Sequence, residues 1–486
     1  MERISLLDFF ELSHLTVSKI FLLYTSQMKL DHRLKLGWFG LLGALAFQGR
    51  FIALFFRDRG FTNSEIGFIL GSNPVISAIA TPIFSYLSDR TSTRKVLTML
   101  ISASVFMVAI YGLASMLKDT AKFITFFLAY FMFSVSYSPT MTIFDAATLV
   151  MLKVNGEDTK SYGDSRLYGA VSWGVISAFI IGPLIDVFKD TWILVIGFCV
   201  SASILAVTMY FIVLPSDEKM KSKRNTLNEV QRQQDTSSVA VSSSTINRLV
   251  KIFTADRWTR TISFYFFVFC LSIGTSLIER LIFLYFSEDL GASNFLCGLS
   301  VLITVAFEIP LFYYSKYIMN RVSLHNMNVI AAVAYCVRVV TYTLINSDSQ
   351  WLLLSVEPLH GVTFALHKLS CLHYISSIAP TGLEASAQSV LSVVQSLGSA
   401  TGVLCGGVII DRYGSDVLYR SAATLIMIAT AVYYYFAVFT STTIPSGSSK
   451  NGDGGGGFEL LKTNEEEDDL TVEGSNDDKF VISDDI

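Results

Sequence analysis

Charged residues are scarce in this sequence, and their scarcity excludes a first class of protein. Only 16% of the 486 residues are charged, whereas a soluble domain carries about 25%. A water-soluble enzyme of ordinary composition is therefore excluded. The charges nearly balance, with 36 basic and 40 acidic residues and a net charge of −4, so no nucleic-acid partner is indicated.

Patterns for catalysis and metal binding are also lacking. The six cysteines show no CxxC spacing, and each falls in a different apolar run: Cys199, Cys270, Cys297, Cys336, Cys371 and Cys405. This spacing indicates neither a zinc site nor a disulfide framework. No HExxH, Walker or GxSxG motif occurs. We therefore expect no metal, no cofactor and no enzymatic activity, and ATP-driven transport has no support.

The chain is instead rich in long apolar runs, since 52% of its residues are hydrophobic. Crossing the hydrocarbon core of a bilayer takes roughly 20 apolar residues, and in lipid such runs must be helical to satisfy their backbone hydrogen bonds. The qualifying runs are 36–56, 66–87, 96–117, 122–147, 166–185, 192–214, 261–286, 296–319, 325–346, 351–378, 385–411 and 416–440. We predict an all-α membrane protein in which twelve transmembrane helices form two six-helix bundles.

The polar segments between the runs divide the chain into five parts. We expect a cytosolic N-terminal arm (1–35), a first bundle (36–214), a basic and serine-rich cytosolic linker (215–260), a second bundle (261–440) and a disordered, acidic cytosolic tail (441–486). Lys and Arg number 21 on the side of the N-terminus and 6 on the other side. The positive-inside rule then places both termini in the cytosol. We expect the protein itself to lie in the plasma membrane or in an endomembrane.

The two predicted bundles share a sequence repeat. The segment Arg50–Phe56 resembles Arg280–Phe286, and each is followed by two glycines at matching spacing. The offset is 230 residues, rising to 231 after one insertion. Pseudo-symmetric halves of six spans are typical of transporters whose halves rock about a site near the bilayer midplane.

Ionisable side chains inside the spans need an explanation, because each would disfavour insertion by about 2.5–3.5 kcal/mol at the bilayer centre. They are Arg50, Asp145, Arg166, Glu279, Arg280, Glu308, Arg338, Glu357, His360, His367 and Lys368. Glu357 and His360 lie one turn apart on a single helix face, and a carboxylate there favours a protonated imidazole. We predict that these two residues, with Arg338 and Glu308, take up and release a proton. A static network that only holds helices together is the alternative.

Several motifs resemble those of one transporter superfamily. They are the turn Ser85–Lys95, Tyr162-Gly163-x-x-Arg166-x-x-Gly169, Pro358–Ala365, Ala387-Gln388 and Gly406-Gly407-x-x-x-Asp411. On these motifs, residues 36–440 resemble the major facilitator superfamily. Within it they are most similar to the branch that contains lactose permease, nucleoside–proton symporters and their eukaryotic relatives. The resemblance implies a transporter fold but names no solute.

The resemblance also implies roles for individual residues. Asp89, Arg90 and Arg94 lie in the superfamily's gating turn. Arg338 and His360 match the arginine and histidine that lactose permease uses in proton coupling.

The match to the permease's substrate site is only partial. Asp145 and Arg166 match its substrate-binding carboxylate and arginine, and we add Arg50 and Glu279 as further substrate-binding candidates. The permease has a second carboxylate one turn after its histidine, where this chain has Thr363. A galactoside substrate is therefore not supported.

These observations together predict a secondary active transporter of a small polar organic solute, sugar-like or nucleoside-like. It would act as a monomer in the lipid bilayer, by proton symport and alternating access. Two alternatives stay open: a transporter-fold receptor or sensor that signals through its acidic tail, and a proton-independent exporter or uniporter.

Overall fold

The computed structural model describes residues 28–157, 161–214, 258–379 and 384–439. The chain divides into two compact units, Met1–Thr442 and Thr443–Ile486. The described residues all belong to the first unit, and every regular element among them is helical. Nearly all of the predicted arm, the linker and the tail lie outside the described residues.

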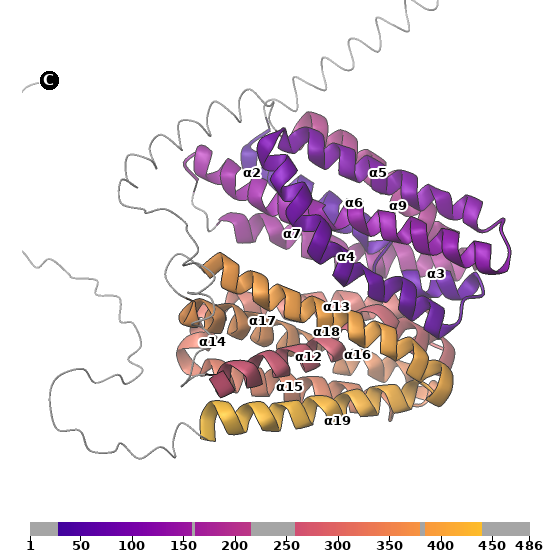
Figure 1. Cartoon of the computed structure of the whole chain (residues 1–486). Coiled ribbons are helices and arrows are strands. Elements are labelled where there is room, and N and C mark those ends of the chain that lie inside the picture. Colours follow the sequence, from indigo (N-terminus) through magenta and orange to yellow (C-terminus); the bar gives the residue numbers. More distant parts are fainter. Residues whose placement is uncertain (1–27, 158–160, 215–257, 380–383, 440–486) are drawn as a thin grey trace, which may run out of the picture. The chain divides into compact units, whose positions relative to one another are not determined.

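The first half of the main unit supplies the helices drawn in indigo to magenta in Figure 1. They are α2 (Leu30–Ala46), α3 (Ile52–Asp58), α4 (Asn63–Arg90), α5 (Thr93–Ala114), α6 (Asp119–Val154), α7 (Ser161–Ile176), η1 (Ser177–Ile181), α8 (Gly182–Phe188), α9 (Trp192–Thr208) and η2 (Met209–Val213). The short η elements are π-helical and continue the α-helices before them.

The second half supplies the helices drawn in red to yellow. They are α12 (Trp258–Leu284), η4 (Tyr285–Asp289), α13 (Asn294–Tyr313), α14 (Ser315–Arg321), α15 (Leu324–Tyr342), η5 (Ser347–Leu352), α16 (Leu353–Val356), α17 (Pro358–Ile378), α18 (Glu384–Tyr413), α19 (Ser415–Tyr434) and η6 (Tyr435–Phe439). Each of the twelve predicted runs thus corresponds to one helix or to consecutive helices.

Three spans are less regular than the sequence predicts. Ten helices in the described part of the chain are long and apolar enough to cross a membrane; the first and tenth spans do not meet that criterion. The first is interrupted between Ala46 and Ile52, and the tenth is divided before Pro358. The predicted eighth span, 296–319, is wrong at its end, because α13 stops at Tyr313. Pro310 lies in the last turn of α13, where it lacks an N–H and crowds the preceding turn.

The first helix begins earlier than its predicted span because its N-terminal turn is stabilised locally. Asp31 and Lys35 form an ion pair at 2.7 Å, four residues apart on α2, which is the spacing that brings helical side chains together. The predicted arm 1–35 therefore overlaps α2 in its last residues.

Glycines allow α18 to approach two other helices closely. A Cβ atom on Gly398 or Gly402 would come within 2.5 Å of the carbonyl oxygens of Phe269 and Ile273 on α12. Gly398 and Gly402 therefore form a close packing surface against α12. On α4, a Cβ on Gly67 would meet the Val403 carbonyl oxygen of α18 at 2.7 Å. Because α4 belongs to the first half and α18 to the second, this contact joins the two halves.

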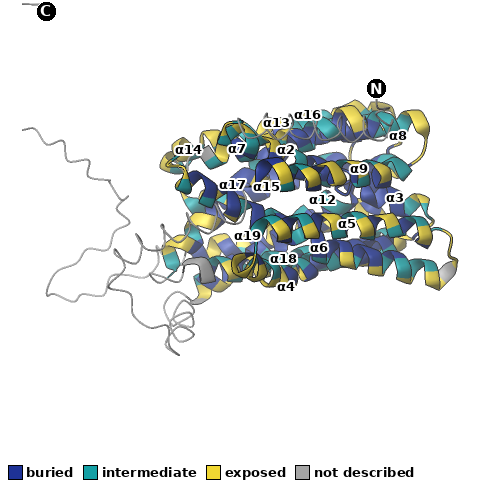
Figure 2. Cartoon of the chain, turned by 90° about the horizontal axis from the view of Figure 1, so that it is seen from above, coloured by how far each residue is buried: buried dark blue, intermediate teal, exposed yellow. Residues whose placement is uncertain are grey.

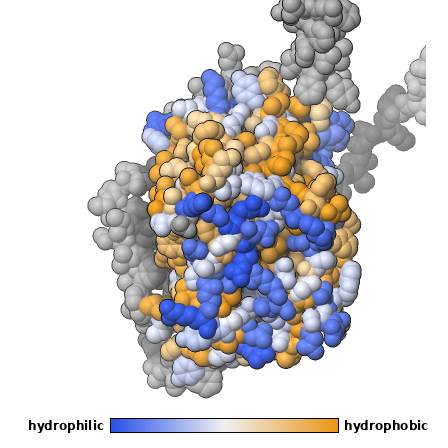
Figure 3. Space-filling view, turned by 90° about the vertical axis from the view of Figure 1, so that its right-hand side faces the viewer, coloured by the Kyte–Doolittle hydropathy of each residue, from blue (hydrophilic) through white to orange (hydrophobic). Residues whose placement is uncertain are grey.

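The outer surface of the bundle suits a lipid environment. Large apolar side chains stay exposed along the helices, as on Ile79, Phe106, Ile196 and Leu397, and Figure 2 shows exposed positions on the outward faces of the helices. Figure 3 views the end near α3 and α16, where hydrophilic residues gather between hydrophobic flanks. A wet end and apolar sides are what a membrane-spanning bundle requires.

Candidate functional site

The most deeply buried charges form a cluster in the second half. Arg338 of α15 donates from Nη2 to Glu357 Oε2 at 2.7 Å and from Nε to the Tyr342 hydroxyl at 2.6 Å. Tyr342 donates in turn to the other Glu357 oxygen at 2.6 Å. Arg338 and Glu357 are each 1% exposed. Both carboxylate oxygens are therefore bonded, as a buried ion pair requires.

His360 of α17 extends this cluster. Its Nδ1 lies 2.7 Å from Nη1 of Arg338. A guanidinium can only donate, so Nδ1 is the acceptor and the ring proton is on Nε2, which faces Glu279 Oε1 at 3.6 Å. A second proton can therefore be added to the ring only after the bond to Arg338 is broken.

An ion pair links this cluster to the first half. Arg50, in the break between α2 and α3, donates to Glu279 of α12 through Nη2 at 2.5 Å and through Nε at 3.2 Å. Such bidentate pairing is the strongest form of a carboxylate–guanidinium contact. Because the two residues come from different halves, a chain of contacts runs across the interface from Arg50 through Glu279 and His360 to Arg338. The structure thus brings together residues that the sequence assigned separately to solute binding and to proton coupling.

Glu308 of α13 lies beside this chain but is not part of it. Among the described residues it makes no hydrogen bond or ion pair, and it is partly exposed. The charges that act on it are those of Glu279, Arg50 and Arg166. A Cβ on Gly361, the neighbour of His360, would lie 2.9 Å from the Glu308 backbone nitrogen. Glu308 is therefore a carboxylate without a direct partner, held next to the network.

The second predicted pair is also formed. Arg166 of α7 donates from Nη1 to Oδ1 of Asp145 on α6 at 3.1 Å, and Tyr162 donates to the same oxygen at 2.5 Å. The guanidinium lies 4.8 Å from the Trp38 ring centroid. Asp145 and Arg166 are 32% and 40% exposed, so both are available to a ligand.

The predicted gating residues lie at the turn between α4 and α5. The Arg90 guanidinium lies 5.2 Å from the Tyr86 ring centroid of its own helix. Arg94 lies 3.8 Å from the ring centroid of Tyr210 in η2, the end of the sixth span. The role of these residues and of Asp89 in gating stays a prediction.

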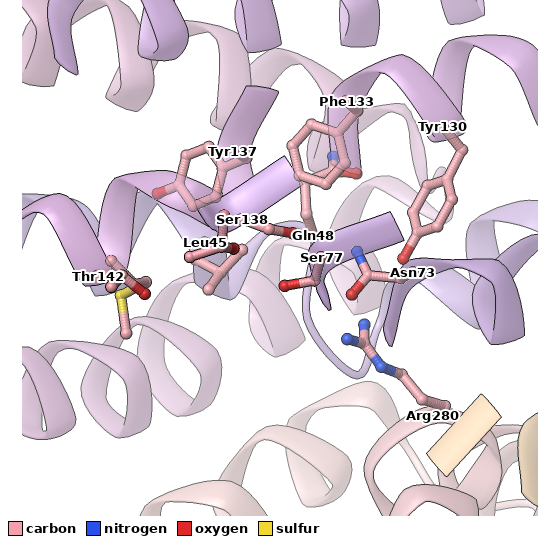
Figure 4. A pocket seen from close by; sticks show the side chains of 12 residues that line it. Leu45, Gln48, Asn73, Ser77, Tyr130, Phe133, Tyr137, Ser138, Thr142 and Arg280 are labelled. Atoms are coloured by element: carbon pink, nitrogen blue, oxygen red, sulfur yellow. The ribbon is translucent and has the colours of Figure 1, made fainter. Parts of the chain in front are cut away.

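A polar cavity opens inside the first half (Figure 4). Its volume is about 320 Å³, and it is lined by residues of α2, of the break between α2 and α3, of α4 and of α6, and by one residue of α12: Leu45, Gln48, Asn73, Ser77, Thr81, Tyr130, Phe133, Tyr137, Ser138, Met141, Thr142 and Arg280. The volume lies at the lower end of the range of about 300–1,000 Å³ for small-molecule sites. From the sequence, Arg280 is identifiable only as a charge in a span, and the cavity is not identifiable at all.

Two aspartates join the halves at one end of the bundle. Asp411 of α18 accepts from the backbone N–H groups of Asn63 and Ser64 at 3.1 and 2.7 Å, which caps the N-terminus of α4. Asp186 of α8 accepts from the backbone N–H groups of Asn294 and Phe295 at 3.1 and 2.8 Å, which caps the N-terminus of α13. A carboxylate at this position bonds the free N–H groups and complements the helix dipole. The end at which α4 and α13 begin is therefore the closed end.

The two caps are related by the repeat. Gly182 precedes Asp186 by four residues, and Gly407 precedes Asp411 by four residues. A Cβ on Gly182 would lie 2.5 Å from the Asn294 carbonyl oxygen, and a Cβ on Gly407 would meet the Asn63 carbonyl oxygen in the same way. The repeated Gly-x-x-x-Asp pattern is the signal that could have revealed Asp186, which the sequence analysis missed.

Two helical halves, joined at one end and enclosing a polar cavity and a buried charge network, define a membrane transporter of the major facilitator type rather than an enzyme. The chain belongs to the MFS_1 like family, whose sequence model matches residues 32–421. A curated relative, the "Uncharacterized transporter YwbF" of Bacillus subtilis (strain 168), is 22% identical over 364 residues, covering 75% of this chain and 82% of the relative.

Solved structures share the fold. The nucleoside transporter NupG is 16% identical with a TM-score of 0.64, covering 84% of this chain and 99% of NupG. A D-xylose-proton symporter is 12% identical with a TM-score of 0.59, covering 84% of this chain and 97% of the symporter. At these identities the likeness shows the fold alone, and it confirms the predicted major facilitator architecture.

Proposed function

We propose that this protein is a secondary active transporter that moves a small polar organic solute, sugar-like or nucleoside-like, together with protons. Its two halves would rock to open the cavity to one side of the membrane and then to the other. The observation that carries the proposal is the charge chain across the interface, Arg50–Glu279–His360–Arg338, with the unpartnered Glu308 beside it. The names of two similar structures, a nucleoside transporter and a D-xylose-proton symporter, agree with this solute class.

The placement of the charges gives a physical route to coupling. Arg50 belongs to the first half, whereas Glu279 and Glu308 belong to the second half. When the halves reorient, the distance from Arg50 to both carboxylates changes, and so does the affinity of Glu308 for a proton. A proton bound in one orientation is then released in the other, which is the requirement for symport.

The other site residues have complementary roles in this proposal. Asp145 and Arg166 are partly exposed but do not line the cavity, so they would contact the solute as it enters or leaves the cavity. Asp89, Arg90 and Arg94 hold the cytosolic gate, and the aspartate caps of α4 and α13 hold the opposite gate. Both termini would lie in the cytosol, which makes the end capped by Asp186 and Asp411 the outer one.

Uptake by reconstituted vesicles tests the proposal. A panel of radiolabelled glucose, xylose, adenosine and uridine is offered with and without an inward proton gradient. We expect the gradient to raise accumulation of at least one solute. Glu308→Gln and His360→Gln should abolish that gain while leaving downhill exchange measurable, because neither removes the cavity. Asp348→Asn, which neutralises an exposed carboxylate outside the spans, should behave as wild type. If Glu308→Gln and His360→Gln both accumulate solute normally, the network is structural and symport fails.

A further inference from the structure

The lining of the cavity in the first half carries charge of one sign only. Its lining contains amide, hydroxyl and aromatic groups, one arginine and no carboxylate. The arginine is Arg280, the one lining residue that comes from the second half. In Figure 4 its guanidinium points from α12 toward Asn73 and Ser77.

Arg280 differs from the other arginines inside the spans. Arg50 pairs with Glu279, Arg166 with Asp145, and Arg338 with Glu357. In the described part of the chain, Arg280 has no hydrogen bond and no ion pair. A charge at membrane depth without a partner in the protein points to a functional site, and a ligand that enters the cavity is in position to supply the partner.

The neutral groups of the cavity are also incompletely bonded. Gln48 is 1% exposed, and neither its amide nitrogen nor its amide oxygen has a partner among the described residues. Asn73 donates from Nδ2 to Ser134 at 2.8 Å, which leaves its Oδ1 as an acceptor. Buried polar groups are almost always bonded, so these unused donors and acceptors are a built set of contacts for a polar ligand.

Aromatic rings complete the lining. Tyr130, Phe133 and Tyr137 stand in a row along α6, with Phe133 and Tyr137 stacked at a centroid distance of 5.5 Å. Tyr137 uses its hydroxyl on the Leu41 carbonyl oxygen at 2.6 Å. The rings therefore offer apolar faces to a ligand whose polar edge meets Gln48 and Asn73.

We propose that this cavity binds an organic anion, a small hydroxylated solute that carries one carboxylate or phosphate group. The anionic oxygens pair with the Arg280 guanidinium, whose fork matches them geometrically, and the neutral part of the solute bonds to Gln48 and Asn73. The inference rests on the proposed transport function and narrows its solutes to sugar acids, sugar phosphates or nucleotides. Because Arg280 alone comes from the second half, a bound anion would also tie the two halves together around the cavity.

Binding to the purified full-length protein tests this without any gradient. Thermal unfolding and calorimetric titration compare glucose with glucuronate and with glucose 6-phosphate, and adenosine with adenosine monophosphate. Glucuronate represents the carboxylate and the two phosphates the alternative group, so the arms separate the two anion classes. We expect one anion to bind at least about tenfold more tightly than its neutral counterpart, as a charge-assisted contact predicts.

Variants then assign that preference to Arg280. Arg280→Gln should weaken anion binding about 10- to 100-fold and leave the neutral counterpart unchanged, and Arg280→Lys should retain part of the preference. Arg420→Gln removes a cation that bonds Thr343 away from the cavity and should change nothing. Without ligand, Arg280→Gln should unfold at the wild-type temperature or above it, since it removes no hydrogen bond and no ion pair among the described residues.

The outcomes separate this inference from the transport proposal. If no anion is preferred to its neutral counterpart, or if Arg280→Gln without ligand unfolds well below wild type, the anion site is refuted. If anions bind through Arg280 but no proton gradient drives uptake, the site stands and symport fails.

Discussion

Removing the aspartate caps should release the closed end of the transporter. Asp186→Asn and Asp411→Asn keep the size of the side chain but remove the charge that faces the N-termini of α13 and α4. A carboxylate at a helix N-terminus contributes about 0.3–1 kcal/mol when exposed and up to about 2 kcal/mol when partly buried. Asp411 is exposed and Asp186 is partly buried, which gives about 1 and about 2 kcal/mol.

The two caps act on different helix pairs, so their effects should add to about 3 kcal/mol in the double variant. That is roughly a 150-fold shift of the equilibrium away from the closed arrangement. The shift is measurable as a distance distribution between spin labels placed at Lys118 and Asp348 in a cysteine-depleted background. Both positions are exposed and lie at this end on opposite halves. A population with a longer distance should grow in each single variant and dominate in the double variant.

A matched control removes a carboxylate at the same end that does not join the halves. Asp190 accepts from the Trp192 backbone nitrogen at 3.0 Å and pairs with Arg59 at 3.4 Å, all within the first half. Asp190→Asn should leave the distance distribution unchanged. If the double cap variant also keeps the wild-type distribution, the caps do not control closure and the reasoning is refuted.

Two further predictions concern the interior network and the opposite gate. Glu357→Gln should lower the free energy of unfolding by about 3–5 kcal/mol because it leaves the buried Arg338 charge uncompensated. Chemical denaturation in detergent measures this free energy. A loss below about 1 kcal/mol would show that the pair is not needed for stability. Asp89→Asn should shift the balance of inward and outward states while the protein stays folded; unchanged cysteine accessibility on both sides would reduce the Ser85–Lys95 turn to a connector.

Much of the architecture could be predicted from the sequence because the bilayer leaves few choices. An apolar run of sufficient length in lipid has to be a helix, so the number, order and type of the spans followed from composition. The breaks in the first, eighth and tenth spans were missed, although Pro310 and Pro358 lie in the sequence as signals. Hydropathy averages over many residues and does not register one missing backbone hydrogen bond.

The site was predictable only in part, because partners depend on packing between segments far apart in the chain. Glu357 and His360 share a face through helical periodicity alone, and the resemblance to lactose permease added Arg338. The sequence could not show that Arg50 pairs with Glu279 across 229 positions, nor that Glu308 has no direct partner among the described residues.

What the sequence by itself determined about this protein is the set of helices and the inventory of charges that lipid would not tolerate. What only the tertiary structure decided is how those charges are shared. Arg280 and Arg50 occupy equivalent positions in the repeat, yet Arg50 is neutralised by Glu279 and Arg280 faces a cavity that contains no acid. Ion pairing acts over a few ångströms, so only the packing of α12 against the break between α2 and α3 determines which arginine is left for a ligand.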